Sequence, residues 1–169
     1  MNEMILAVLV VIFSAESNLA TKFVPFAQMP KECASVYRDH AHEVFGVTPA
    51  QGTKMAEVDF DRDGHNEILV YNGTHGSAGE GWTIFCVQGE RWNKIGEVFG
   101  TLSVVKFKQH KGLLVCTPCG WEQAEWEYFE FKRGQFMKQL EITVNYAPPK
   151  ENILRDRPQR IVINICNKK

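Results

Sequence analysis

Apolar residues recur at helical spacing in only one part of this chain, and alternate in short runs over most of the rest. Between residues 30 and 45 they recur at intervals of three and four, which places them on one stripe of a helix. Pro30 suits the first turn of such a helix, and Gly46 is a natural stop signal. The pattern therefore predicts a single helix over residues 30–45.

From about residue 54, short runs of β-branched and aromatic residues alternate with turn residues. Gly89 and Gly134 mark tight hairpins between such runs. Residues 147–160 contain three prolines with mixed charge and predict an extended connection. The predicted strands span residues 54–60, 67–72, 82–88, 91–98, 102–107, 112–116, 125–132, 135–146 and 161–166.

This β region contains an internal repeat. An offset of 44 positions aligns Trp82 with Trp126 and Lys94 with Lys138. The other aligned pairs are Phe85 and Phe129, Val87 and Phe131, Trp92 and Phe136, Glu97 and Glu141, and Val98 and Ile142. One further residue of offset aligns His65 and residues 68–70 with His110 and residues 113–115. Chance similarity of two hairpins is the alternative to duplication.

The repeat predicts two units, over about residues 54–98 and 102–146. A period of this length is typical of propeller blades. Two units cannot close a propeller, which needs about four blades or more. We therefore predict a mainly β fold: an open antiparallel meander of two propeller-blade-like units, with the N-terminal helix covering part of one face.

The first twenty residues differ in character from this β domain. Residues 4–13 form a continuous apolar run, followed by small and polar residues. Ten apolar residues are too few to span a bilayer core of about 30 Å as a helix, but they suit a secretory signal. The leading residues lack the usual Lys or Arg, and a buried N-terminal strand is the alternative. We predict a signal peptide over 1–20, cleaved after Ser17 or Ala20, and a secreted or periplasmic domain over 21–169 with no membrane span.

Composition adds little to this picture. A length of 169 residues fits one domain, and a net charge of −1 gives no argument for binding nucleic acid. Export allows disulfides, but five cysteines leave at least one thiol unpaired within the chain. The candidates for pairing are Cys33, Cys86, Cys116, Cys119 and Cys166.

The strongest chemical signal is an acidic loop at residues 59–67. Asp59, Asp61, Asp63 and Glu67 place four carboxylates in nine residues, with Gly64 after the third. Such a cluster repels itself unless a cation lies among the oxygens, and Ca²⁺ takes about six to eight oxygen ligands. An ordinary acidic turn explains one or two aspartates but explains four alternating carboxylates poorly. Mg²⁺ fits less well because it demands tighter octahedral geometry.

The loop does not fit an EF-hand. That pattern needs a bidentate Glu at loop position 12, where this chain has Val70. The flanking segments also predict strands rather than helices. Glu67, at position 9, instead closes the loop as the next strand begins.

Residues 58–70 resemble the calcium loop of FG-GAP and VCBS-like β-repeat proteins, which occur in integrin-type propellers and in many secreted bacterial proteins. The family more often has Asp at the closing position, where this chain has Glu67. The resemblance implies one structural Ca²⁺ and a backbone ligand at the His65 carbonyl. The side-chain ligands it implies are Asp59, Asp61, Asp63 and Glu67. The second unit has no carboxylate in its equivalent loop, 107–112.

Other motifs give weaker signals. His75 and Glu80 are candidate partner contacts in a glycine-rich loop at 72–81, and Trp121 is another in the loop at 117–124. Cys116 and Cys119 have the spacing of a redox pair, but no helical pattern follows them.

The leading hypothesis is an exported, non-enzymatic Ca²⁺-binding module with an unknown protein or carbohydrate partner. One alternative is an inhibitor or immunity-type protein for a secreted enzyme, acting through the 72–81 and 117–124 loops. Another is a thiol–disulfide redox protein using Cys116 and Cys119.

Overall fold

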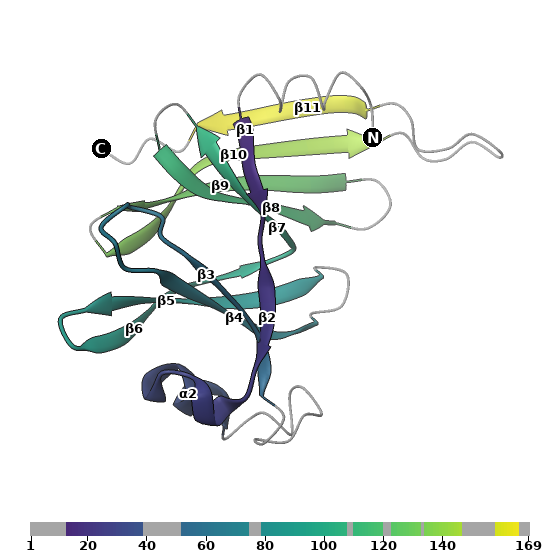
Figure 1. Cartoon of the computed structure of the whole chain (residues 1–169). Coiled ribbons are helices and arrows are strands. Elements are labelled where there is room, and N and C mark those ends of the chain that lie inside the picture. The colour runs from purple at the N-terminus through teal and green to yellow at the C-terminus, as the bar shows by residue number, and fades with distance from the viewer. Residues whose placement is uncertain are drawn as a thin grey trace.

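The computed structural model of this chain describes residues 13–38, 52–74, 79–107, 110–119, 123–132, 134–146 and 158–165. Its strands form two sheets, which Figure 1 shows one above the other. The five-stranded sheet contains, in order, β2 (Thr21–Val24), β3 (Thr53–Val58), β4 (Glu67–Thr74), β5 (Glu80–Gln88) and β6 (Arg91–Phe99). The six-stranded sheet contains β1 (Phe13–Asn18), β7 (Thr101–Phe107), β8 (His110–Pro118), β9 (Gln123–Lys132), β10 (Gln135–Tyr146) and β11 (Pro158–Ile165).

Each sheet is built on a four-stranded antiparallel meander. Unit 1 is the meander β3–β4–β5–β6, and unit 2 is β7–β8–β9–β10. The additional strands lie at the sheet edges, with β2 on β3, β1 on β7 and β11 on β10. No pairing among the described strands closes either sheet. The predicted fold class, mainly antiparallel β with two open units, is confirmed.

The strand register supports the internal repeat. In unit 1, Phe85 pairs with Lys94 immediately beside a β-bulge. In unit 2, Phe129 pairs with Lys138 immediately beside a β-bulge of its own. The sequence offset of 44 relates these two pairs, so the irregularity falls at the same place in both units. A bulge adds a residue and bends the strand, and a shared bulge is not expected from two unrelated hairpins.

A surface ion pair is repeated in the same way. Lys94 Nζ lies 2.6 Å from Glu97 Oε1 in unit 1, and Lys138 Nζ lies 2.6 Å from Glu141 Oε2 in unit 2. Exposed pairs of this kind stabilise a fold by only about 0–1 kcal/mol. These two ion pairs fall at equivalent places in the two units, as the offset of 44 predicts.

Hydrophobic clusters fill the spaces around both sheets. One lies between the five-stranded sheet and the helices and includes Met55, Ile68, Val70 and Phe85. A second lies between the sheets and includes Phe60, Leu69, Trp82, Ile84, Leu113, Val115 and Phe131. A third lies on the outer face of the six-stranded sheet and includes Leu114, Tyr128, Leu140, Ile142 and Val144.

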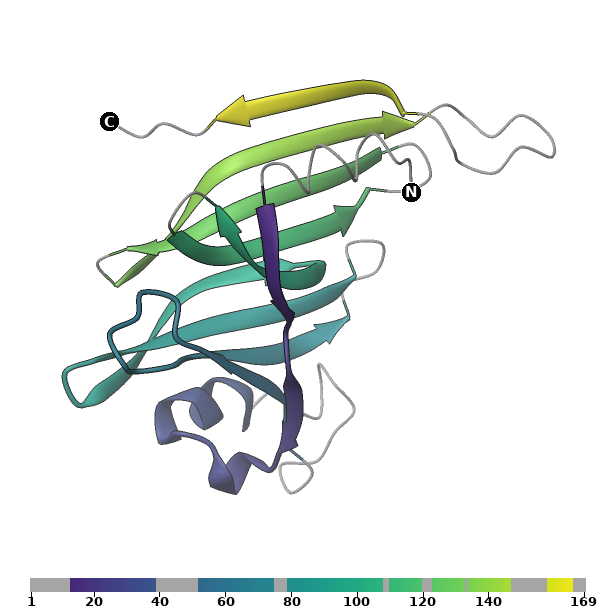
Figure 2. The same ribbon diagram turned by 45° about the horizontal axis from the view of Figure 1, so that its top comes forward.

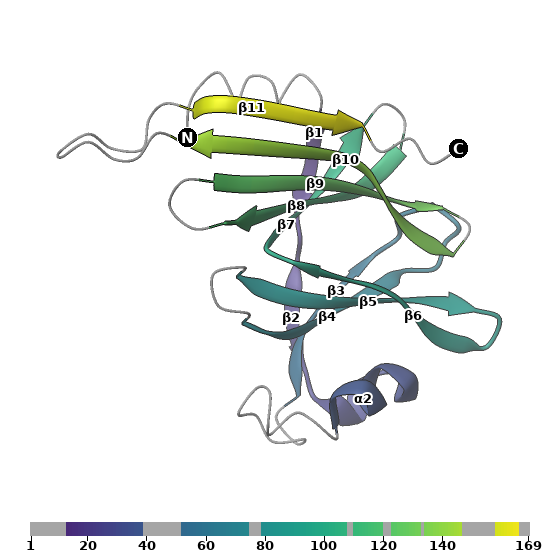
Figure 3. The same ribbon diagram turned by 180° about the vertical axis from the view of Figure 1, so that it is seen from behind.

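These clusters show how the two units pack. Leu69 lies between the sheets, whereas its counterpart Leu114 lies on the outer face of unit 2. Ile68 faces the helices, whereas its counterpart Leu113 lies between the sheets. The units are therefore stacked head to tail, with the same face of each pointing in one direction, as in neighbouring propeller blades. Figures 2 and 3 show the resulting layers.

The helical elements cover the back of unit 1, which is the face that carries Ile68. They are the short 3₁₀ helix η1 (Phe26–Gln28) and the helix α2 (Lys31–Arg38), which Figure 1 shows below the five-stranded sheet. The Ala34 N–H donates to the Pro30 carbonyl at 2.9 Å, so Pro30 lies at the start of α2 as predicted. The remainder of the predicted helix, 39–45, lies outside the described residues.

The strands β1 and β2 are not predicted by the sequence pattern. Residues 13–18 fall inside the predicted signal peptide and pair with β7, while removal of residues 1–20 stays a prediction. None of the helices in the described part of the chain has the length and apolar character needed to cross a bilayer.

Candidate metal centre

The acidic loop joins β3 to β4 within unit 1. Val58, the last residue of β3, pairs with Glu67, the first residue of β4, so the ladder closes the base of the loop. Phe60 turns inward from the loop, is 3% exposed, and meets Phe136 of unit 2 edge-on at 5.6 Å between ring centroids. The loop is therefore anchored at its base and against the second unit.

Three carboxylates of this loop converge. One oxygen from each of Asp59, Asp61 and Glu67 lies within 4.8 Å of the other two, an arrangement that can hold a metal ion. Asp63 and His65 line the same cavity, of about 290 Å³, together with Asp61 and Glu67. The structure thus brings the predicted ligands to one place, with Asp59, Asp61 and Glu67 nearest to one another.

Backbone hydrogen bonds hold the loop in its curved form. Asp59 accepts from the Arg62 N–H at 2.6 Å and from the Gly64 N–H at 3.3 Å. Asp61 accepts from the Asp63 N–H at 3.3 Å, and Asp63 accepts from the His65 N–H at 2.7 Å. Aspartates commonly fold loops through such local bonds. Each carboxylate has further lone pairs, so these bonds leave capacity for a cation.

Two residues of the loop have a left-handed backbone. Arg62 has φ 65° and Gly64 has φ 89°. Glycine adopts this region without steric cost, whereas a side chain such as that of Arg62 is disfavoured there. The hydrogen bonds to Asp59 involve the N–H groups of these same two residues, so the turn and the carboxylate geometry depend on each other.

Glu67 is the buried member of the cluster. It is 3% exposed, and its Oε2 accepts from the Phe60 N–H at 2.9 Å. Burial raises the pKa of Glu67 to about 7, against the lowering effect of the Phe60 hydrogen bond, and the charge of Asp61 adds to the rise. Burial and the charge of Asp63 also raise the pKa of Asp61. Ionised carboxylates in this arrangement are unfavourable without a positive charge nearby.

Unit 2 supplies basic groups beside the acidic loop. Lys111 Nζ, from β8, donates to the Asp59 carbonyl at 3.3 Å. His110, Lys111 and Lys132 line a second cavity, of about 550 Å³, that Asp61 and Arg62 also line. The segment 107–112 lacks carboxylates, and no short motif in the sequence places it beside the acidic loop. The head-to-tail stacking of the units accounts for the contact.

The thiol chemistry does not favour a redox centre. The four described cysteines, Cys33, Cys86, Cys116 and Cys119, are free thiols, while Cys166 lies outside the described residues. Burial and the neighbouring Cys119 raise the pKa of Cys116 to about 11. Redox-active cysteines have a lowered pKa, whereas the pKa of Cys116 is raised. This difference argues against thiol–disulfide exchange at Cys116. Export and disulfide pairing after export both stay predictions.

The predicted partner contacts are only partly within the described chain. Glu80 is exposed and lies 3.6 Å from Lys54 Nζ, whereas His75 and Trp121 lie outside the described residues. The β6–β7 connection joins the ends of the two loops. The Gly100 N–H donates to the Glu80 carbonyl at 2.7 Å, and Thr117 Oγ1 donates to the Phe99 carbonyl at 2.5 Å.

No protein-family model, no curated protein and no solved structure matches this chain.

Proposed function

We propose that this chain is an exported Ca²⁺-binding β-repeat protein that acts as a binding module rather than as an enzyme. The observation that carries the proposal is the buried carboxylate of Glu67, which lies beside Asp59 and Asp61 with ligand oxygens within 4.8 Å of one another. A divalent cation offsets the repulsion in this cluster and the unfavourable burial of its charge.

Calcium is the cation that fits this site best. All the candidate ligands are oxygens, and they come from one continuous loop and the first residue of β4, an irregular arrangement that Ca²⁺ accepts more readily than Mg²⁺ does. The resemblance of residues 58–70 to the FG-GAP and VCBS-like calcium loop supports the same ion, with Asp63 and the His65 carbonyl as further ligands.

The role of the ion is structural. Asp59 and Asp61 belong to the loop, whereas Glu67 begins β4. A cation held by all three ties the end of β3 to the start of β4 and fixes the loop against unit 2. Partner binding then falls to the surfaces that the braced loop supports. The apolar run at residues 4–13 supports export to the cell surface, the periplasm or the medium.

Calcium titration of the purified protein tests the proposal. We expect isothermal titration to show one site with a dissociation constant of about 0.1–1 mM or tighter, the range of extracellular calcium modules. The variants Asp61→Asn and Glu67→Gln should abolish binding. Glu80→Gln, a carboxylate at the opposite end of β5, is the matched control and should bind as the wild type does. Absence of heat at millimolar Ca²⁺, or unchanged binding by Asp61→Asn, would contradict the proposal.

A second function is favoured by the paired loop ends. The described ends of the 72–81 and 117–124 loops are held together through Phe99 and Gly100, so the two loops leave the same end of the molecule. Paired loops on a rigid β scaffold suit an inhibitor or immunity-type protein that blocks a secreted enzyme.

Affinity capture from an envelope extract of the source cell tests this second function. The immobilised wild-type chain should retain one enzyme from the extract. Added to that enzyme after its purification, the chain should inhibit its activity. A Glu80→Lys variant should weaken that inhibition because it reverses a charge at this end. Asp61→Asn should lower inhibition less than Glu80→Lys does, because Asp61 lies in the acidic loop and not in the 72–81 or 117–124 loop. Full inhibition by Glu80→Lys, or no inhibited enzyme, would argue against this role.

A further inference from the structure

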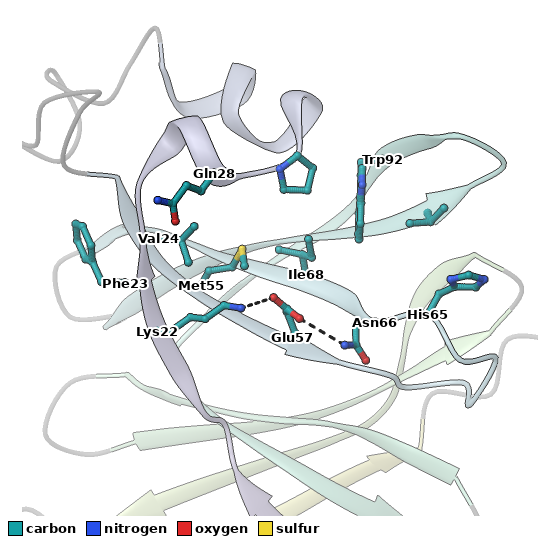
Figure 4. Close-up of a pocket in the computed structure, with 12 residues that line it drawn as sticks. Lys22, Phe23, Val24, Gln28, Met55, Glu57, His65, Asn66, Ile68 and Trp92 are labelled. Atoms are coloured by element: carbon teal, nitrogen blue, oxygen red, sulfur yellow. Dashed lines mark hydrogen bonds and ion pairs between the residues drawn. The ribbon is translucent and has the colours of Figure 1, made fainter.

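A cavity on the back of unit 1 is separate from the carboxylate cluster. It measures about 470 Å³, within the range of about 300–1,000 Å³ that is usual for small-molecule sites. Figure 4 shows it between β2 on one side, the 3₁₀ helix above and the strands of unit 1 below. Its apolar residues include Met55, Ile68 and Trp92, and its polar residues include Lys22, Glu57 and Asn66.

The repeat accounts for the presence of this cavity. In unit 2, the position equivalent to Trp92 is Phe136, which stacks on Phe129 at 5.3 Å between ring centroids and is covered by unit 1. On the corresponding face of unit 1, the described residues place η1 and α2 rather than another sheet. Trp92 and Ile68 line the cavity on this face. Their counterparts in unit 2, Phe136 and Leu113, pack instead in the cluster between the two sheets.

The polar groups of the cavity are balanced in charge. Lys22 Nζ lies 2.6 Å from Glu57 Oε1, so the two charges cancel. Asn66 Nδ2 reaches Glu57 Oε2 only at 3.5 Å, and Gln28 adds a neutral amide to the lining. The site thus offers neutral donors and acceptors at its rim. It does not select for a strongly charged ligand.

The apolar wall is formed around the indole of Trp92. Figure 4 shows this ring edge-on, with one face turned toward Ile68 and the interior of the cavity. An aromatic face beside neutral amide groups suits a ligand that has one apolar side and hydrogen-bonding groups around its edge. A sugar ring has this character, because its C–H groups lie on one face and its hydroxyls project from the rim.

We infer that this cavity binds a neutral saccharide, with one sugar ring against Trp92 and its hydroxyls bonded to Asn66, Gln28 and the Lys22–Glu57 pair. The site survives export, because both predicted cleavage positions precede Thr21 and leave β2 intact. This inference deepens the proposed function by naming the class of ligand that the module binds.

The saccharide site is linked to the cation site through the loop. His65 and Asn66 line this cavity, and His65 also lines the cavity of the carboxylate cluster. A cation that orders the loop therefore orders one wall of the saccharide site. This coupling, unlike the cavity itself, rests on the proposed function.

Saturation-transfer NMR with a defined set of sugars tests the inference. The probes are the methyl glycosides of glucose, galactose, mannose and N-acetylglucosamine, each at about 100-fold excess over the full exported protein with Ca²⁺ present. We expect at least one glycoside to receive saturation. Trp92→Ala should weaken its binding about tenfold, and Asn66→Ala about threefold, as expected for a lost aromatic contact and a lost hydrogen bond.

Matched variants separate a local effect from a general one. Phe99→Ala removes an exposed aromatic at the far end of β6, and Gln139→Ala removes an amide from unit 2. Both should bind the glycoside as the wild type does. The proposed site is wrong if Phe99→Ala weakens glycoside binding as much as Trp92→Ala does. It is also wrong if saturation transfer to the glycoside is unchanged in Trp92→Ala. Failure of all four glycosides to bind overturns the ligand class.

The cation and saccharide proposals fail in different ways. Calcium titration of the same sample reports the cation site directly. Calcium binding without glycoside binding overturns the saccharide site alone, and glycoside binding without calcium binding overturns the cation site alone. When both bind, removal of Ca²⁺ with EDTA should weaken the glycoside about twofold to fivefold through the shared loop. An affinity unchanged by EDTA overturns the coupling.

Discussion

At the scale of single residues, Glu67 decides how the acidic loop responds to protons and cations. Its carboxylate is buried, and its pKa is raised from an ordinary 4.5 to about 7. The folded chain without a cation therefore binds a proton at Glu67 more tightly than the unfolded chain does. The contribution of Glu67 to the stability of the cation-free fold should then be fully present below about pH 4.5 and be lost as the pH rises to about 7.

Thermal unfolding with EDTA or Ca²⁺ across this pH range checks the first prediction. With EDTA, the melting temperature should fall between about pH 4.5 and 7 more steeply than in Glu67→Gln, which has no proton to lose there. With saturating Ca²⁺, the part of the melting temperature that depends on Glu67 should instead rise with pH, because the cation binds the ionised carboxylate. Identical pH profiles for wild type and Glu67→Gln would show that the Glu67 pKa is not raised.

Gly64 gives a second prediction at this scale. A Cβ built at this residue meets nothing within 4 Å, so an added methyl group is opposed only by the backbone, which has φ +89°. Gly64→Ala should therefore cost about 1 kcal/mol of stability and weaken Ca²⁺ binding about fivefold.

Urea unfolding and calcium titration of Gly64→Ala measure these two effects. Gly96→Ala is the matched control, because Gly96 has no positive φ and its added Cβ makes only an ordinary contact with Phe136 at 3.8 Å. That control should change neither quantity by a comparable amount. Equal effects from the two substitutions would remove the argument from backbone conformation.

At the scale of elements, the two β-hairpins that join the first two strands of each unit differ in one respect. The β3–β4 hairpin carries a loop of eight residues between Val58 and Glu67 with the carboxylates, whereas only residues 108–109 separate β7 from β8. If a cation braces the longer loop, it should suppress local opening of the β3–β4 hairpin. At low denaturant it should leave local opening of the β7–β8 hairpin unchanged.

Hydrogen exchange of the two hairpins tests this third prediction. Ca²⁺ should slow exchange of the amides that donate to the loop carboxylates, those of Phe60, Arg62, Asp63, Gly64 and His65. Peptides from β7 and β8 serve as the internal control and should change little in native buffer. Slowing of equal size in both hairpins would show that the ion does not act as a local brace.

The elements also show what the sequence pattern can and cannot predict. The strands from β3 to β10 were predicted within a few residues, because alternation and turn glycines mark them. β2 was missed because it is only four residues long and three of these are exposed. β1 was missed because it begins at the last residue of the apolar run and covers the small and polar residues that were read as the end of a signal peptide.

For the metal site, the sequence predicts the contacts made within the acidic loop itself. The spacing of Asp59, Asp61 and Glu67 within one loop made their convergence foreseeable, because nearby ligands on a hairpin meet without help from the rest of the fold. The contact of Lys111 with Asp59 depends on how the units stack, and the sequence does not encode that in any short motif. The cavity beside Trp92 was missed for the same reason, since its lining comes from β2, η1 and the strands of unit 1, which lie far apart in the sequence.

At the scale of the whole molecule, the two units share one core. Leu113 and Val115 of unit 2 pack with Leu69 and Ile84 of unit 1, and all four are fully buried. Phe60 of the acidic loop packs into the same core. Separate unfolding of either unit would expose these side chains, so the units should unfold as one cooperative body.

This gives a fourth prediction, that a cation bound only to unit 1 stabilises unit 2 against global unfolding. In urea, Ca²⁺ at about 100 times its dissociation constant should add about 2.7 kcal/mol to the stability of both units. Hydrogen exchange of peptides from β4–β5 and from β8–β9 should report the same shift in midpoint. Leu113→Ala, which leaves a cavity in the shared core, should lower the free energy of unfolding reported by both sets of peptides by about 2–5 kcal/mol.

Leu102→Ala is the control for this test, because Leu102 borders the same core but is only partly buried. It should lower the midpoints less than Leu113→Ala does, and equally in the two units. A calcium shift seen only in the β4–β5 peptides would show that the units unfold independently. Stacking would then be weak, and the ion would act on unit 1 alone. Equal shifts mean that one loop, ligated at Asp59, Asp61 and Glu67, stabilises the entire two-unit fold.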